Sequence, residues 1–272
     1  MVAGGAGVAG GSRFRAWRPR VPGVAEVLHA RMTDHVYPMH AHDSWTLLIV
    51  DDGMVRYDVH RHEHGALDQV ITLLPPHVPH NGRAATESGF RKRVVYLDFG
   101  QLPERLIGRA ADRPVLIDPV LRLRVGQLHE ALGRPGDELE AESRLALITD
   151  RLRHNLQHYP AERPVAAAPG IAYRLRDLLD AAVPETVLLR DAAARLHAHP
   201  AHLVRAFSAE FGLSPHQYVT GRRVDLARGF LLGGMPASQV AAEAGFYDQA
   251  HLTRHFKNVL GTTPVRFAGS GR

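Results

Sequence analysis

Two stretches near the end of the chain, AHLVRAFSAEFGLSP at 201–215 and AHLTRHFKNVLGTTP at 250–264, repeat one pattern at an offset of 49 residues. Ala, His, Leu, Arg, Phe, Gly and Pro hold equivalent places in both stretches, and the residues between them differ. Aligned at this offset over 192–218 and 241–267, the two copies share nine identities in 27 positions. Each copy predicts a short Ala-rich helix, a turn and a second helix, which is the pattern of a helix-turn-helix unit.

The repeated residues are those that a helix-turn-helix scaffold needs. A leucine and a phenylalanine four residues apart give each second helix one apolar face. Glycine tolerates the left-handed backbone at a helix end, and a hydroxyl residue before proline starts the next helix. The scaffold residues are Leu203, Phe207, Gly212, Ser214 and Pro215 in the first copy and Leu252, Phe256, Gly261, Thr263 and Pro264 in the second.

The second helices, predicted at 200–211 and 249–260, differ on the faces that point away from this scaffold. An arginine is repeated on both faces; arginine can pair with guanine, and glutamine with adenine, in the major groove. We therefore predict a DNA-reading face on each helix, richer in polar side chains in the second copy. These faces comprise Ala201, His202, Val204 and Arg205 in the first helix and Gln249, Ala250, His251, Thr253, Arg254 and Lys257 in the second. A helical domain that does not bind DNA is the alternative.

The composition indicates a globular protein of two domains. The chain has 272 residues, of which 45% are hydrophobic and 22% charged, and it has no cysteine. The lack of cysteine excludes disulfides and thiol-ligated metals and fits a cytoplasmic location. No apolar run approaches the roughly 18 residues of a membrane span, so we expect no membrane association. Residues 170–272 carry +4 of the net charge of +5, from twelve basic and eight acidic residues, which favours a polyanionic partner.

The first half of the chain predicts a β-domain at 16–112, after a disordered tail at 1–15. Short runs rich in Val, Ile, Leu and Tyr are bounded there by turn residues, which is typical of strands. The runs lie at 44–50, 53–60, 69–75 and 93–99. Their spacing favours an antiparallel sandwich or barrel.

A helical hairpin is predicted at 113–159, where the apolar period becomes helical. The stripe of the first helix contains Leu121, Val125, Leu128 and Leu132, and that of the second contains Leu145, Ile148, Leu152 and Leu156. These stripes either pair two copies of the chain through 118–158 or simply cover the barrel. A Pro-rich linker at 160–169 then leads to a helical domain at 170–268.

The C-terminal domain resembles the AraC/XylS family of transcription regulators. VAAEAGFYDQAHLTRHFKNVLGTTPVRFAG at 240–269 is similar to the family signature IAxxxGFxdqxHLxRxFKxxxGxTPxxFR. The resemblance implies an α+β multidomain fold. An antiparallel cupin-like β-barrel with a helical hairpin acts as the sensor domain, and an all-α domain carries two helix-turn-helix motifs joined by a linker helix at 214–232. The two second helices would enter successive major grooves on one face of the DNA.

Four positions depart from the family pattern, of which Ala201 stands where the family often has a larger or polar residue. His199 stands where the family usually has Ser, and His197 lies near the usual Gly of the first turn. Ala268 follows the final aromatic residue in place of the usual Arg. We therefore expect the first unit to contribute less to sequence readout than the second.

Histidines of the N-terminal domain pose a separate question. His40, His42 and His80 are placed where cupin barrels carry metal ligands, but no carboxylate follows at the spacing of a cupin site. We favour a metal-free role for them, either in packing or in a pocket that binds a small-molecule effector through His40, His42, Trp45 and His80. A metal site is the alternative.

These patterns predict an effector-responsive transcription regulator that needs no cofactor. Its expected partners are double-stranded promoter DNA, a small-molecule effector, RNA polymerase and a second copy of the chain. Effector binding would shift the population between arrangements of the two domains. The alternative function is a metal-dependent cupin enzyme fused to a helical domain.

Overall fold

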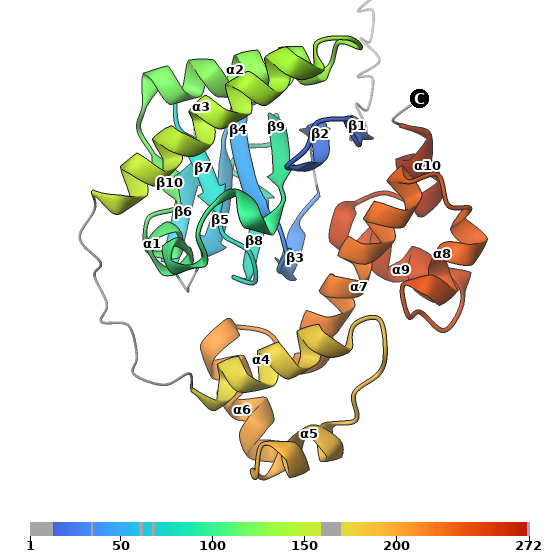
Figure 1. Cartoon of the computed structure of the whole chain (residues 1–272). Helices are drawn as coiled ribbons and strands as arrows, with labels where there is room; N and C mark the ends of the chain where they lie inside the picture. The colour runs from blue at the N-terminus through green and yellow to red at the C-terminus, as the bar shows by residue number, and fades with distance from the viewer. Residues whose placement is uncertain (1–12, 34, 60–61, 67–68, 159–169, 271–272) are drawn as a thin grey trace, which may run out of the picture.

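The computed structural model describes residues 13–33, 35–59, 62–66, 69–158 and 170–270. Two antiparallel sheets and a helical hairpin form the N-terminal half, and the C-terminal half contains helices alone (Figure 1). This arrangement confirms the predicted α+β fold. The linker predicted at 160–169 and residues 1–12 of the predicted tail lie outside the described residues.

The two sheets pack face to face, and the predicted strand runs appear in them as β4, β5, β7 and β9. The six-stranded sheet has the order β1 (Arg13–Trp17), β2 (Val24–Met32), β9 (Phe90–Leu97), β4 (Trp45–Gly53), β7 (Ile71–Leu74) and β10 (Val115–Leu116). The four-stranded sheet has the order β3 (Tyr37–His40), β8 (His80–Ala84), β5 (Val55–Val59) and β6 (His62–Ala66).

Both ends of the predicted β-domain differ from expectation. Residues 13–15, expected in a disordered tail, belong to β1, which pairs antiparallel with β2. Val115 and Leu116, expected in the helical hairpin, pair with β7 as β10. Both strands are short edge strands, and they are fixed by a neighbouring strand rather than by a long apolar run of their own.

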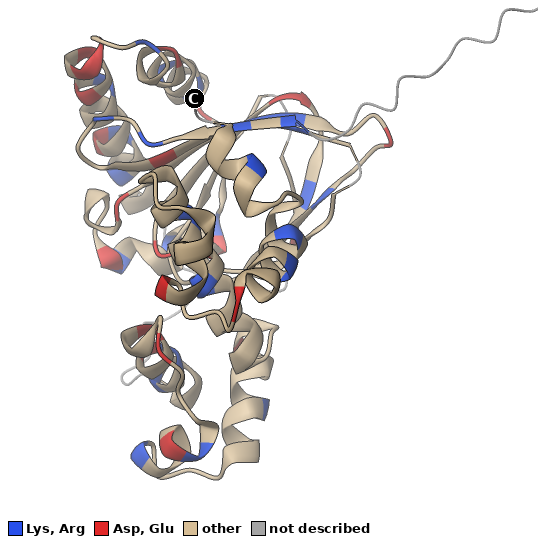
Figure 2. Ribbon diagram, turned by 90° about the vertical axis from the view of Figure 1, so that its right-hand side faces the viewer, with Lys and Arg blue, Asp and Glu red and all other residues tan. Residues whose placement is uncertain are grey.

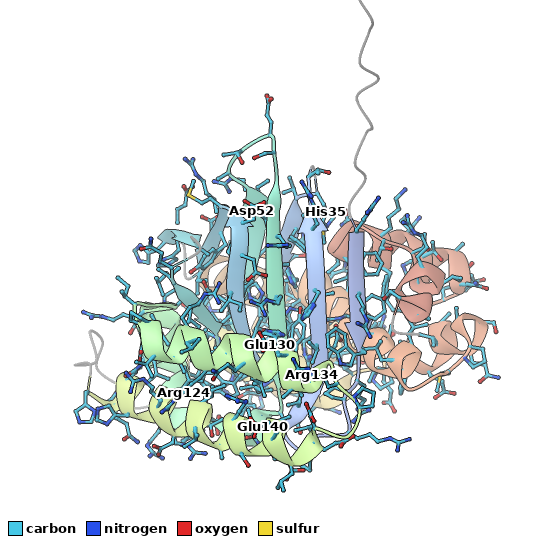
Figure 3. All side chains as sticks on the ribbon, turned by 90° about the horizontal axis from the view of Figure 1, so that it is seen from above. His35, Asp52, Arg124, Glu130, Arg134 and Glu140 are labelled. Carbon is cyan, nitrogen blue, oxygen red and sulfur yellow. The ribbon has the colours of Figure 1, made fainter. Side chains whose placement is uncertain are left out.

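The hairpin consists of α2 (Pro119–Leu132) and α3 (Glu138–Gln157), preceded by the short helix α1 (Ile107–Asp112). All eight residues of the two predicted stripes are buried against the outer face of the six-stranded sheet. The stripes therefore cover the sheet, as one of the two interpretations expected. Figure 3 shows the hairpin lying across the strands, with charged side chains such as Arg124, Glu130 and Glu140 on its surface.

Seven helices form the C-terminal half, where the sequence predicted a helical domain. They are α4 (Ile171–Ala182), α5 (Leu189–Arg195), α6 (Pro200–Phe211), α7 (Pro215–Leu232), α8 (Ala237–Glu243), α9 (Gln249–Leu260) and α10 (Pro264–Gly269). Helices α5 and α6 form the first helix-turn-helix unit, α8 and α9 form the second, and α7 connects them (Figure 1). Among the described residues, no helix is both long enough and apolar enough to cross a membrane.

The predicted caps are present at the ends of these helices. Gly212 and Gly261 end α6 and α9 with left-handed φ angles of 71° and 74°. The hydroxyl of Ser214 accepts a hydrogen bond from the backbone N–H of Gln217, whose side chain accepts from the Ser214 N–H in return. This capping box fixes the start of α7 directly after the first unit.

The repeat is less regular in space than in sequence. Helices α6 and α9 are 49 residues apart, but α5 and α8 are only 48 residues apart, because the turn of the second unit is one residue longer. The alignment of Ala192 with Ala241 is therefore wrong by one residue, and Ala193 is the structural equivalent of Ala241. An alignment at one offset could not reveal an insertion in a turn whose two sequences are unrelated.

Helix α7 and helix α9 pack against the open end of the barrel at β3 (Figure 1). One apolar cluster contains Leu28, Leu48 and Val94 of the six-stranded sheet together with Leu252 and Phe256 of the second helix-turn-helix unit. The two halves thus share a continuous core, which positions the functional residues described next.

Candidate nucleic-acid interface and internal cavity

The two predicted reading faces point away from the core of the helical half. In both helices the scaffold leucine and phenylalanine are fully buried, whereas Arg205 and Arg254 are exposed at equivalent places. The remaining predicted reading residues are exposed or half-buried, so none of them is part of the hydrophobic core. The geometry therefore leaves both arginines free to meet a base edge.

His251 is the predicted reading residue with the most local contacts. Its Nδ1 accepts a hydrogen bond from the Tyr247 backbone N–H at 3.3 Å, and its own backbone N–H donates to Asp248 at 2.6 Å. Its ring also packs edge-on against Phe246. These contacts hold the start of α9, so His251 has a structural task in addition to any contact with DNA.

Part of the basic excess of the helical half is not at the surface. Figure 2 shows basic and acidic residues interspersed along the ribbons of both halves. Arg222 and Arg228 of α7 are buried and paired with carboxylates, so they cannot contact phosphates. The charge count therefore overstates the positive charge that is available to a polyanion.

An internal cavity of about 50 Å³ lies between the two sheets. Leucine and valine side chains of both sheets form much of its wall, and its polar lining includes His40, His42, His80 and Lys92. Leu260, the last residue of α9, also lines the cavity. The second helix-turn-helix unit thus contributes to the wall of the cavity.

The three predicted histidines come together in this cavity. One ring nitrogen of each lies within 4.8 Å of those of the other two, and all three side chains are buried. Burial lowers the pKa of His40 and of His42 well below the usual range, and it lowers the pKa of His80 to about 4. The imidazoles are therefore neutral at pH 7 and can act as ligands or hydrogen-bond partners.

Trp45 does not line the cavity, so its predicted place in the pocket wall is wrong. Side chains alternate along β4, and those of Thr46 and Leu48 face the cavity. Trp45 points to the opposite face of the sheet, where its indole N–H donates to the Phe99 carbonyl at 3.1 Å. It belongs to the core under α2 and α3.

Several polar residues of the cavity were not singled out from the sequence. The Tyr37 and Thr46 hydroxyls are buried and have no hydrogen-bond partner among the described residues. The Lys92 ammonium lies 4.2 Å from the Tyr37 ring centroid, and burial lowers the pKa of Lys92 to about 7. Its place on β9 between Arg91 and Arg93 was a usable signal, since only two lysines occur in the chain.

A second missed set is the polar contact between the barrel and α7. Asp225 accepts a hydrogen bond from His42 Nδ1 at 3.0 Å and another from Arg228 at 3.0 Å. Arg228 also donates to Glu26 of β2 at 2.6 Å, and its guanidinium lies 4.3 Å from the Tyr96 ring centroid. A groove of about 310 Å³ opens beside this cluster. The histidine cavity is thus linked to the helix that joins the two helix-turn-helix units.

Two family models match the chain. Residues 22–148 match the AraC-like ligand binding domain, and residues 192–270 match a helix-turn-helix domain. The probable transcriptional regulator LumQ of Photobacterium leiognathi is 37% identical over 62 residues, which cover 22% of this chain. That match spans only a quarter of the length of LumQ.

Solved structures share the whole fold. ToxT from Vibrio cholerae has 10% sequence identity and a TM-score of 0.59, over 96% of this chain and 99% of ToxT. Wild-type ToxT bound to an unsaturated fatty acid gives a TM-score of 0.53 at 10% identity, over 94% of each chain. Identities this low show likeness of fold alone.

A ligand-binding barrel followed by two helix-turn-helix units defines a two-domain regulator of transcription. The chain belongs to the AraC family, as both matched domains and their order show. It is accordingly a regulator and not an enzyme, which removes the alternative of a metal-dependent cupin enzyme.

Proposed function

We propose that the chain binds promoter DNA sequence-specifically in the cytoplasm, with α6 and α9 in successive major grooves, and so regulates access of RNA polymerase. One observation carries this proposal: two helix-turn-helix units connected by α7 present Arg205 and Arg254 at equivalent exposed places on α6 and α9. Arginine in this setting favours a bidentate contact with guanine. The second unit adds Gln249 and Lys257, and it would supply more of the readout.

The cavity supports control of this binding by an effector. An effector that reaches Leu260 of α9 could also engage the unpartnered hydroxyls of Tyr37 and Thr46. Either contact changes the position that is favoured for α9 against the barrel, which is a population shift between two arrangements. ToxT, which shares the fold, has been solved with a bound fatty acid. The cavity in this chain accepts only a smaller occupant unless the sheets part.

A second copy of the chain would bind on the outer face of the hairpin. Leucines that are not part of the buried stripes are exposed there: Leu123 of α2 and Leu139 and Leu147 of α3. The same hairpin carries charged side chains such as Arg124, Glu130 and Glu140 (Figure 3). We expect Leu139→Asp combined with Leu147→Asp to convert a dimer to a monomer in analytical ultracentrifugation, without loss of helix content. An unchanged dimer would place the interface elsewhere.

DNA recognition is tested with Arg254→Ala. Preferred sites are first selected from genomic fragments with the full chain, and affinity is then measured by fluorescence anisotropy. The substitution should weaken binding to the preferred site by about 1–3 kcal/mol and relax discrimination at one base pair. Arg266→Ala, on α10 outside the reading face, is the matched control and should keep that discrimination.

Salt dependence separates the possible outcomes. A protein that contacts phosphates loses affinity steeply as salt rises. If Arg254→Ala lowers the affinity equally for every DNA sequence, then Arg254 contacts only phosphate. Absence of salt-dependent binding to any fragment would overturn the proposal and favour a helical domain that does not bind DNA.

A further inference from the structure

We propose that His40, His42 and His80 bind one divalent first-row transition-metal ion through their Nε2 atoms, and that Asp225 of α7 orients one of these ligands. This inference goes beyond the proposed function, which needs no metal, and it contradicts the metal-free pocket favoured by the sequence. It holds or fails independently of DNA binding.

The histidine rings are close enough to share one ion. Their ring centroids are 4.8 Å apart for His40 and His42, 4.6 Å for His40 and His80, and 5.3 Å for His42 and His80. One ring nitrogen from each residue falls within 4.8 Å of the other two, so small rotations bring all three to the roughly 2.0–2.1 Å bonds of a zinc–imidazole site. Because β3 pairs with β8, His40 and His80 are held directly opposite each other.

The hydrogen bonds of the three rings decide which nitrogen is available. Nδ1 of His40 lies 2.7 Å from the Pro38 carbonyl, Nδ1 of His80 lies 3.1 Å from the Val78 carbonyl, and Nδ1 of His42 lies 3.0 Å from an Asp225 carboxylate oxygen. Each partner can only accept, so every Nδ1 must carry the proton and donate. The three Nε2 atoms then carry lone pairs.

No hydrogen bond within the described part of the chain engages these Nε2 atoms. Metal-binding histidines characteristically donate their second ring nitrogen to a carbonyl or carboxylate, which fixes the ring and raises its basicity. All three rings have this arrangement. One ring nitrogen of each histidine lies within 4.8 Å of those of the other two, which packing for stability alone does not require.

The size of the cavity favours an ion over an organic molecule. A water molecule needs roughly 10–15 Å³ of such space, so about 50 Å³ holds an ion with one to three waters. Three imidazoles leave at least one coordination position open, and that position faces this space. Imidazole ligands suit Zn²⁺, Ni²⁺, Cu²⁺ and Fe²⁺.

Carboxylates on and around α7 can offset the charge of a dication together with that of the Lys92 ammonium, which also lines the cavity. Ion pairs link Arg222 and Arg228 to four carboxylates, so these six groups have a formal charge of −2. The carboxylates belong to Glu26, Asp43, Asp180 and Asp225. Asp225 lies closest to the site through His42, and it is the residue that transmits the presence of an ion to α7.

Metal binding is tested on the full-length chain without an affinity tag, after removal of metals with a chelator. Titration with Co²⁺ should produce visible ligand-field absorption that saturates at one ion per chain, and Zn²⁺ should displace it. We expect His80→Gln to weaken binding at least tenfold. His62→Ala, an exposed histidine of β6, is the matched control and should bind as the unsubstituted chain does.

X-ray absorption of the Zn²⁺-loaded, unsubstituted chain gives a readout that requires no variant to fold, and it should show three imidazole ligands. Asp225→Asn should lower the affinity by about 10- to 100-fold with the same three ligands, as expected for a positioning residue. Substoichiometric binding, fewer than three imidazoles, or equal binding by His80→Gln would overturn the site. Unchanged affinity in Asp225→Asn would overturn the role of Asp225.

Discussion

His197 adopts a backbone conformation that its side chain disfavours. Its φ is 50°, and it occupies the turn of the first helix-turn-helix unit at the place where Gly245, with φ of 78°, lies in the second. The sequence comparison noted a histidine near the usual glycine, but a constant offset of 49 pairs His197 with Phe246. The one-residue difference between the two turns concealed the correspondence, and only the backbone angles reveal it.

His197→Gly should therefore stabilise the helical half. A side chain in the left-handed region costs about 1–2 kcal/mol, and the greater freedom of glycine in the unfolded chain offsets part of that gain. We expect the free energy of unfolding to rise by about 1 kcal/mol, measured by urea denaturation with circular dichroism. His197→Ala, which keeps a Cβ atom, is the control. Equal effects of the two substitutions would mean that the backbone angle is not the cause.

Among the elements, those with a strong local pattern were predicted and those fixed by a distant partner were not. The bounds predicted for the second helices, 200–211 and 249–260, agree with α6 and α9, because proline or glycine marks their ends. Trp45 was assigned to the wrong side of β4, because an almost continuous apolar run shows no alternation between the two faces. Both faces of β4 are buried, one in the core between the two sheets and the other in the core under α2 and α3.

The contact between β2 and α2 should make stability depend on pH. His29 Nε2 lies 3.2 Å from His129 Nδ1. Burial and the nearby Arg93 lower the pKa of His29 to about 4, and burial together with His29 lowers that of His129 well below its usual range. Both histidines are neutral in the folded chain, so their contribution is complete above the unfolded pKa of about 6.5 and is lost as the pH falls towards 4.

His129→Gln removes one titrating group from this contact. We expect the loss of unfolding free energy between pH 7 and pH 4 to be smaller than in the unsubstituted chain, in urea titrations at each pH. Other buried histidines also destabilise the chain in acid, so the difference between the two proteins is the quantity that matters. His154→Gln, at an exposed position of α3, should leave the pH dependence unchanged. The same slope for all three proteins would refute a role for the His29–His129 pair.

At the scale of the whole molecule, the connection between the halves was beyond the reach of sequence patterns. Glu26 and Arg228 are 202 residues apart, and His42 and Asp225 are 183 apart. Neither pair shows a local period or motif, so the sequence predicted two domains without indicating which residues join them. The barrel and α7 are nevertheless joined by buried charges, which links the cavity to the predicted DNA-reading helices.

Breaking the buried Glu26–Arg228 pair should weaken the contact between the barrel and α7. Arg228→Gln leaves the Glu26 carboxylate buried without its counterion, and removal of one partner of a buried pair costs about 3–5 kcal/mol. Burial raises the pKa of Glu26, and Arg228 opposes that rise. Without Arg228 the folded pKa should rise further, so the variant should lose more stability at pH 8 than at pH 5 relative to the unsubstituted chain.

Two further variants distinguish the pair from a general effect of charge on α7. Glu26→Gln combined with Arg228→Gln removes both charges, and it should recover part of the lost unfolding free energy and abolish the added pH dependence. Arg223→Gln makes the same change of charge on α7, but Arg223 bonds to Glu185 and Thr186 within the helical half, so we expect a smaller loss. If the double variant is no more stable than Arg228→Gln, Glu26 is not the partner whose charge matters. The contact between the barrel and α7 would then depend on Asp225, which accepts hydrogen bonds from both Arg228 and His42.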